Sequence, residues 1–151
     1  MEQLDVIGLM QALQALERNM SVALMYAGLR IPQFRLLDAL ERMGQATVTE
    51  MSQALHITRA TASVLINELL AAGVVATVEH ESDRRSFHVR LTELGMNKLS
   101  VGRKDINVYL SKVSAHYPPE MVSMLNLFAG NFPRAPAPPT ASLDPSSTHR
   151  N

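Results

Sequence analysis

The chain is 151 residues long, with 46% hydrophobic and 19% charged residues, enough to bury the core of one globular domain. It has no cysteine, which excludes disulfides, thiol-based redox sensing and zinc sites with cysteine ligands. The formal net charge is zero, although many nucleic-acid-binding domains are basic. No apolar run reaches the roughly 18 residues of a membrane span, and Glu2 and Asp5 stand where a signal peptide would be basic. We therefore expect a cytoplasmic protein.

The first predicted helix covers residues 1–29 and has an apolar face too broad for one small domain to cover. Its stripe is Val6, Leu9, Leu13, Leu16, Met20 and Ala23, widened by Ile7, Met10 and Leu24. Such a face suits a core helix, or a helix shared between a domain and its dimer partner. Gly28 and Pro32 break the pattern, and the next helix is expected from Pro32 to about Met43, with Gly44 at its end.

Two short helices are expected next. Residues 46–48 read as a short extended piece, and Thr49 is expected to cap a helix over residues 50–55. Thr58 is a good cap for the following helix, because its hydroxyl can accept from an unpaired amide one turn on. The apolar stripe of that helix is Ala62, Leu65, Ile66 and Leu69. Gly73 stands where a glycine commonly ends a helix.

The region after Gly73 predicts a hairpin. Two β-prone runs, residues 74–78 and 86–91, flank the polar and turn-rich residues 81–85. A helix-turn-helix followed by a hairpin with arginines at its tip is a winged helix-turn-helix, here expected over about residues 32–91. The predicted fold class is therefore mainly α with a small β-hairpin.

The C-terminal third predicts two more helices and a tail. Thr92 is expected to cap a long helix to about His116, and Pro118-Pro119 to stop it and open a last helix. These helices and the first one show apolar faces that suit dimerisation, so residues 1–132 are expected to be a single domain with N- and C-terminal dimerisation helices. Five of the eight prolines lie in residues 133–151, which we expect to form a disordered Pro/Ser-rich tail.

Several motifs resemble one family of proteins. The string Asp83-Arg84-Arg85, followed by VRLTELG over residues 89–95, resembles the wing and the next helix start of the MarR family of transcription regulators. The string Thr58-Arg59-Ala60-Thr61-Ala62-Ser63 and the string Gln33-Phe34-x-x-Leu37 are also similar to the family. The resemblance covers about residues 4–132. It implies a homodimer without cofactors that binds double-stranded DNA at a pseudo-palindromic operator and represses.

The residues expected to contact DNA lie on the second helix of the helix-turn-helix and on the wing, because the start of such a helix reaches base edges in the major groove. They are Thr58, Arg59, Ala60, Thr61, Ser63, Val64, Arg84, Arg85, His88 and Arg90. Arg59 can pair with a guanine or a phosphate, and Ala60 and Val64 can touch a thymine methyl. Relatives often carry a basic or polar residue in place of Val64, so the chain departs from the family there.

The wing has its own expected roles. Arg85 can enter a narrow minor groove, where the negative potential is strongest. The resemblance makes Asp83 the support that holds the wing arginine in place. The plain alternative is that Arg84 and Arg85 belong to a solvated turn, and that Ser63 and Val64 are ordinary helix surface.

The resemblance also implies a second site, for a small aromatic or phenolic ligand. This site would lie between the dimer helices and the reading head, which is the winged helix-turn-helix expected over about residues 32–91. The residues expected to line it are Met10, Met25, Tyr26, Arg30 and Phe34, with ordinary packing as the alternative. No catalytic motif occurs and the histidines form no closed metal-ligand set, so neither an enzyme nor a metal site is expected. A protein-interaction module whose wing arginines grip an acidic partner stays open as the competing function.

Overall fold

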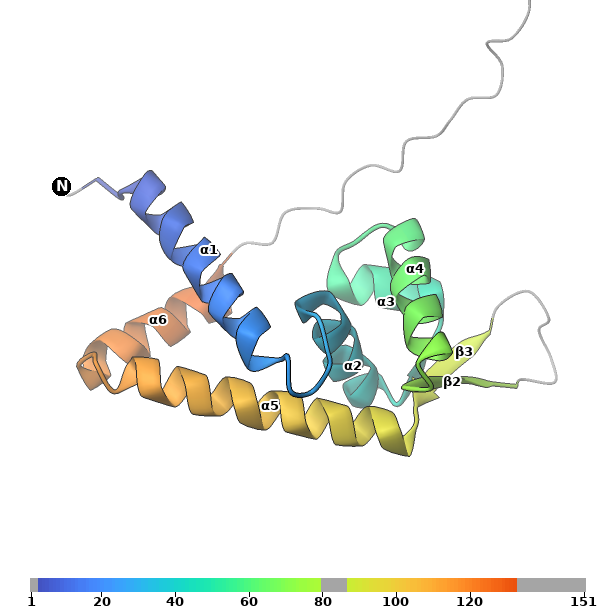
Figure 1. Ribbon diagram of the computed structural model, residues 1–151. Helices are drawn as coiled ribbons and strands as arrows, with labels where there is room; N and C mark the ends of the chain where they lie inside the picture. Colours follow the sequence, from blue (N-terminus) through green and yellow to red (C-terminus); the bar gives the residue numbers. More distant parts are fainter. Residues whose placement is uncertain (1–2, 80–86, 133–151) are drawn as a thin grey trace, which may run out of the picture.

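The computed structural model describes residues 3–79 and 87–132. Along them run α1 (Val6–Ala23), α2 (Ile31–Met43), β1 (Gln45–Ala46), α3 (Val48–Leu55), α4 (Arg59–Ala71), β2 (Val75–Val78), β3 (His88–Leu91), α5 (Glu93–Ser114) and α6 (Pro119–Asn131). Figure 1 shows α2, α3, α4 and the strands gathered into a head, from which α5 runs to the opposite end of the molecule, where α6 begins. The predicted wing-tip residues Asp83, Arg84 and Arg85, and the predicted tail over residues 133–151, lie outside the described residues.

The first helix is shorter than expected and covers Val6–Ala23 rather than residues 1–29. Asp5 starts it, because its carboxylate accepts from the N–H of Gly8 at 3.0 Å. The helix ends before a turn in which Gly28 has a φ of +65°. That left-handed conformation cannot continue a right-handed helix, so the chain changes direction before α2.

The start of α3 corrects a second expectation, because Thr47 and not Thr49 caps this helix. The Thr47 hydroxyl accepts from the N–H of Glu50 at 3.2 Å, and the Glu50 carboxylate accepts from the N–H of Thr47 at 2.7 Å. This reciprocal capping box satisfies two amides at once. The same hydrogen bond from the Thr47 backbone is the largest cause of the lowered pKa of Glu50. As a result, α3 takes in Val48, and the predicted extended piece is Gln45–Ala46.

The two other predicted caps are confirmed. Thr58 Oγ1 accepts from the N–H of Thr61 at 3.1 Å, and Thr92 Oγ1 accepts from the N–H of Gly95 at 3.1 Å. Gly73, with a φ of +69°, follows Ala72, the C-cap of α4, and the N–H of Val74 donates to the carbonyl of Leu69 at 3.0 Å. This is the Schellman ending that favours glycine.

The hairpin and its third strand are confirmed as an antiparallel sheet with the strand order β1-β3-β2. Val75 lies opposite Leu91 and Val78 opposite His88, while Ala46 of β1 lies opposite Val89 on the other edge. Side chains alternate between the two faces of a strand. Val89 and Leu91 are therefore buried against the helices, whereas Arg90 is exposed.

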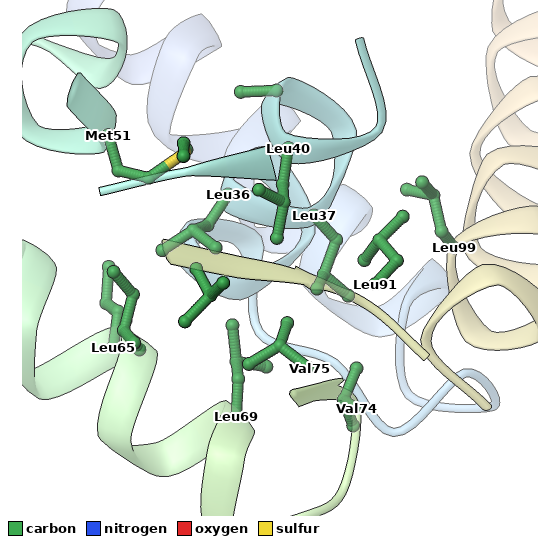
Figure 2. Packing of buried hydrophobic residues seen from close by; sticks show 14 of the residues in the cluster. Leu36, Leu37, Leu40, Met51, Leu65, Leu69, Val74, Val75, Leu91 and Leu99 are labelled. Atoms are coloured by element: carbon green, nitrogen blue, oxygen red, sulfur yellow. The ribbon is translucent and has the colours of Figure 1, made fainter. Parts of the chain in front are cut away.

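The core lies inside the head, between α2, α4 and the sheet. Figure 2 shows Leu36, Leu37 and Leu40 of α2 meeting residues of α4 and of the strands. The residues that complete this cluster include Met51, Leu65, Ile66, Leu69, Val74, Val75, Val89, Leu91 and Leu99. Each fully buried aliphatic side chain contributes roughly 1.5–3 kcal/mol. Because α1 and α6 contain no buried residue, the head has a core of its own.

The first half of α5 is fixed on the head by close packing and by ion pairs. A Cβ at Gly102 would lie 3.0 Å from a methyl of Leu24 and 3.1 Å from the ring of Phe34, so the helices meet where a larger residue would clash. The next residue, Arg103, pairs with Asp38 and with Glu41 of α2, each at 2.6 Å. The hydrogen bond with Asp38 is the main reason that the pKa of Arg103 is raised. These contacts join the first half of α5 to α2.

Candidate nucleic-acid interface

The first turns of α4 form an exposed ridge on the head. Ala62, Leu65, Ile66 and Leu69 anchor the opposite side of the helix in the core. Arg59, Ala60 and Thr61 are exposed, Val64 is 57% exposed, and Ser63 is half-buried. The predicted reading residues of the helix therefore share one accessible surface. Thr58 differs from them, because its hydroxyl is already used as the cap and as the donor to Thr61 Oγ1 at 2.9 Å.

A shallow groove of about 600 Å³ lies beside this ridge. It is lined by Thr47, Val48, Thr49, Arg59, Ala60, Ser63 and Phe87. The walls from α3 and from Phe87 were not predicted as site residues. The spacing of Thr47 and Glu50 was the signal for the first of these walls, because the capping box fixes where α3 begins. Hydroxyl groups and one guanidinium suit contact with a phosphate backbone.

Two of the residues predicted to contact DNA, His88 and Arg90, lie on β3. Arg90 is exposed on β3, opposite Gln45 and Ala76, and its guanidinium donates to the Leu91 carbonyl at 3.4 Å. His88 is half-buried, and its charge adds a small lowering to the pKa of Glu50. Asp83, Arg84 and Arg85 fall outside the described residues, so their roles at the wing tip stay predictions.

The charge on α4 is balanced within the helix. Arg59 is its one basic side chain and Glu68 its one acidic side chain. Glu68 forms an ion pair with Arg30, which stands immediately before α2. The same carboxylate oxygen accepts from Gln33 Nε2 at 3.2 Å. The sequence places Arg30 among the expected ligand-site residues, and no local pattern predicts its pairing with Glu68, which lies 38 positions away.

The residues predicted for a ligand site have different surroundings. Met10, Met25 and Tyr26 are exposed, and Tyr26 is 90% accessible. Arg30 pairs with Glu68, whereas Phe34 packs against the head core and faces Gly102. Met25 and Tyr26 therefore form no wall within a single chain.

A second kind of surface covers the helices away from the head. Its exposed apolar side chains are Leu4, Val6, Ile7, Met10, Leu13 and Val22 near or on α1, Val101, Val108 and Leu110 on α5, and Met121, Met124, Leu125, Leu127, Phe128 and Phe132 on or after α6. Apolar patches of this extent mark interaction surfaces on proteins. Within the described residues, no helix combines the length and the apolar character needed to cross a bilayer.

The helix pair α3–α4 and the sheet β1-β3-β2 define a winged helix-turn-helix protein. Residues 27–86, which run from before α2 to beyond β2, match the model of the MarR family.

Solved structures share the fold. Wild-type MarR from E. coli in the apo form is 18% identical, with a TM-score of 0.73 over 88% of this chain and 100% of that one. A MarR mutant from E. coli complexed with operator DNA is 18% identical, with a TM-score of 0.72 over 83% and 91%. A MepR-like protein complexed with pseudoligands is 24% identical, with a TM-score of 0.64 over 86% and 94%. No curated protein sequence matches the chain.

Proposed function

We propose that the protein is a DNA-binding transcription regulator that acts as a homodimer in the cytoplasm. The observation that carries the proposal is the exposed ridge of α4, where Arg59, Ala60 and Val64 face away from a helix side buried in the core. A helix held in this way can enter the major groove, which admits one α-helix. The solved operator complex of the structurally similar MarR supports the same use of the fold.

The reading head would divide its work between two grooves of the duplex. Arg59 would pair with a guanine or a phosphate, while Ala60 and Val64 would contact a thymine methyl in the major groove. Arg85 of the wing would enter an adjacent minor groove, with Asp83 as its support, and Arg84, His88 and Arg90 would approach phosphates. Because Val64 offers no hydrogen bond, discrimination at its base pair would come from apolar contact.

The exposed apolar helices support a homodimer, which would carry two heads. The faces of α1, α5 and α6 that one chain leaves exposed would be covered by a second copy. A two-fold dimer presents two recognition helices to two half-sites, so the operator would be pseudo-palindromic. Bound across a promoter, such a dimer would repress.

A small aromatic or phenolic ligand would weaken DNA binding from the crevice between the dimer helices and the head. The complex of the MepR-like protein with pseudoligands supports ligand binding in this fold. In this chain the second copy would have to supply walls that Met25 and Tyr26 lack in the single chain. A ligand acts in this way only if it favours the dimer state that does not fit DNA. A screen of aromatic acids and phenols for loss of DNA binding tests this proposal.

The experiment that tests DNA binding begins with a pool of genomic fragments. The protein is mixed with the pool, the bound DNA is sequenced, and affinity for a selected duplex is compared with affinity for a scrambled duplex across a salt series. We expect an enriched pseudo-palindrome and an affinity that falls steeply as salt rises. Absence of enrichment together with weak binding to all duplexes would favour the protein-interaction module.

A further inference from the structure

The recognition helix α4 carries an acidic side chain beside its reading residues. Glu68 lies four residues after Val64, and side chains at this spacing are neighbours, with about 5–6 Å between their Cβ atoms. Thr61, Val64 and Glu68 follow one another on the same side of the helix at intervals of three and four residues. In the proposed complex, a carboxylate one turn from Val64 would lie within a Debye length, about 10 Å at 0.1 M salt, of phosphates beside the Val64 contact. An unpaired Glu68 carboxylate would repel the DNA backbone.

Two side chains from the start of α2 converge on this carboxylate. The Arg30 guanidinium pairs with Oε2 of Glu68, and Gln33 Nε2 donates to the same oxygen at 3.2 Å. Gln33 is itself held, because its Oε1 accepts from the Arg30 N–H at 3.0 Å. The Arg30 side chain is 59% exposed and that of Glu68 is 41% exposed. Exposed pairs add little to folding stability, so stability alone is a weak reason for this arrangement.

We propose that Arg30 masks Glu68, so that α4 can approach a polyanion without presenting a bare negative charge. The inference rests on the proposed DNA-binding function and deepens it by naming a residue that sets affinity without touching DNA. The charges of Arg59 and Glu68 cancel on α4, and the formal net charge of the whole chain is zero. The chain therefore has no excess positive charge to offset an unpaired Glu68 carboxylate. Loss of Arg30 would expose one carboxylate per head and therefore two per dimer. Arg30 is the N-cap residue of α2, so the position of α2 also sets whether the Glu68 carboxylate on α4 is paired.

The test is a double-mutant cycle on the full-length protein, with a duplex selected from the genomic pool as the probe. Arg30→Ala should weaken binding about fivefold at 0.1 M salt, by repulsion that salt screens, so the loss should shrink as salt rises. Glu68→Gln alone should bind as well as wild type or slightly better. The double variant Arg30→Ala/Glu68→Gln should return to within about twofold of wild type. Arg30→Lys, which keeps the charge, should lose little.

Arg42→Ala is the matched control. Arg42 is 71% exposed, pairs with Asp38 at 2.8 Å and lies at the other end of α2. Its replacement by alanine changes the net charge by the same amount as Arg30→Ala does. It should weaken binding less than Arg30→Ala does. Thermal melts of each variant show that the fold is intact, and rescue by Glu68→Gln is an effect that a structural role of Arg30 would not produce.

Each other outcome overturns the inference in a distinguishable way. If Arg30→Ala weakens binding and Glu68→Gln does not restore it, Arg30 contacts a phosphate directly. If Arg42→Ala costs as much as Arg30→Ala, only the net charge matters. If Arg30→Ala binds as wild type, there is no mask, although the proposed function stands. If the wild-type protein binds no duplex, the proposed function fails and the mask fails with it.

Discussion

The head and the outer helices of this molecule are built in different ways. The head encloses side chains such as Leu36, Leu40 and Ile66 that have no accessible surface. In contrast, α1 and α6 contain no buried residue, and the buried residues of α5 all lie in its first half, near the head. The head therefore depends on its own chain, whereas in the proposed homodimer the outer helices would depend on a second copy.

The largest expected effect comes from breaking the head. Leu40 of α2 is fully buried in the core of the head. Leu40→Ala should lower the free energy of unfolding by about 2–5 kcal/mol, through lost transfer energy and a residual cavity. Urea unfolding followed by circular dichroism measures it. Met96→Ala, at a residue 49% exposed beside the head, is the comparison and should cost far less. Equal losses for both variants would contradict a self-contained head.

The next largest effect tests the outer helices. Leu127→Glu combined with Phe128→Glu places two charges on the apolar face of α6, where an interface would have to bury them at high cost. Light scattering at micromolar concentration should give about 33 kDa for the wild type, twice the 16.6 kDa of one chain, and one chain mass for the variant.

Met96→Glu is the control for that experiment, because Met96 is exposed near the start of α5, beside the head. This variant should remain dimeric. A wild type that scatters as a monomer would remove the dimer and two-headed DNA binding together. A variant that stays dimeric would place the interface away from α6.

A smaller effect concerns the capping box of α3 within the head. Thr47→Ala removes the hydroxyl that accepts from the Glu50 N–H and should cost about 1 kcal/mol. The pKa of Glu50 is lowered below its ordinary value of 4.5, chiefly by the hydrogen bond from the Thr47 backbone. Its contribution to stability is therefore present above the unfolded pKa and is lost as pH falls through the lower folded pKa.

Unfolding curves between pH 7 and pH 3 for the wild type and for Glu50→Gln measure this contribution. The wild type should lose more stability than the variant as the pH falls below 4.5. Parallel curves would show that the box does not depend on the charge of Glu50.

The smallest expected effect comes from removing the C-terminal residues. A chain that ends before Pro133 should keep its melting temperature and its affinity for DNA nearly unchanged, because residues 133–151 carry no apolar period. Differential scanning fluorimetry and binding to the selected duplex check both quantities. A fall of several degrees would mean that these residues stabilise the folded dimer.

The features that could be predicted from the sequence are those set by the local spacing of residues. Thr58, Gly73 and Thr92 act over three or four residues, so their roles at helix ends could be predicted from local spacing. The stripe from Ala62 to Leu69 marks the buried side of α4 by its helical period. The cap at Thr47 was not predicted because Thr47 and Thr49 both lie near the start of α3, and only the distance to Glu50 distinguishes them.

Other features could not be predicted, because they join distant parts of the chain. Arg30 and Glu68 are 38 residues apart, and Arg103 and Asp38 are 65 residues apart. The groove beside α4 combines the start of α3 with Phe87 and depends on how the sheet folds against the helices. The local spacing of residues in the sequence does not predict contacts between such distant positions.

Under the proposed function the head contacts DNA through α4 and through the wing, and these two contacts should respond differently to salt. Arg85→Ala removes one cation from each wing of the dimer, so the slope of log affinity against log salt should flatten by up to about 2. Val64→Ala should leave that slope unchanged and alter base preference by about 1–3 kcal/mol at one position.

The most direct measurement is therefore a salt series for both variants and the wild type on the selected duplex and on duplexes that differ from it at single base pairs. We expect a flatter slope for Arg85→Ala alone and altered base preference for Val64→Ala alone. If both variants bind as the wild type does while circular dichroism shows intact helices, the winged helix does not read DNA in this way.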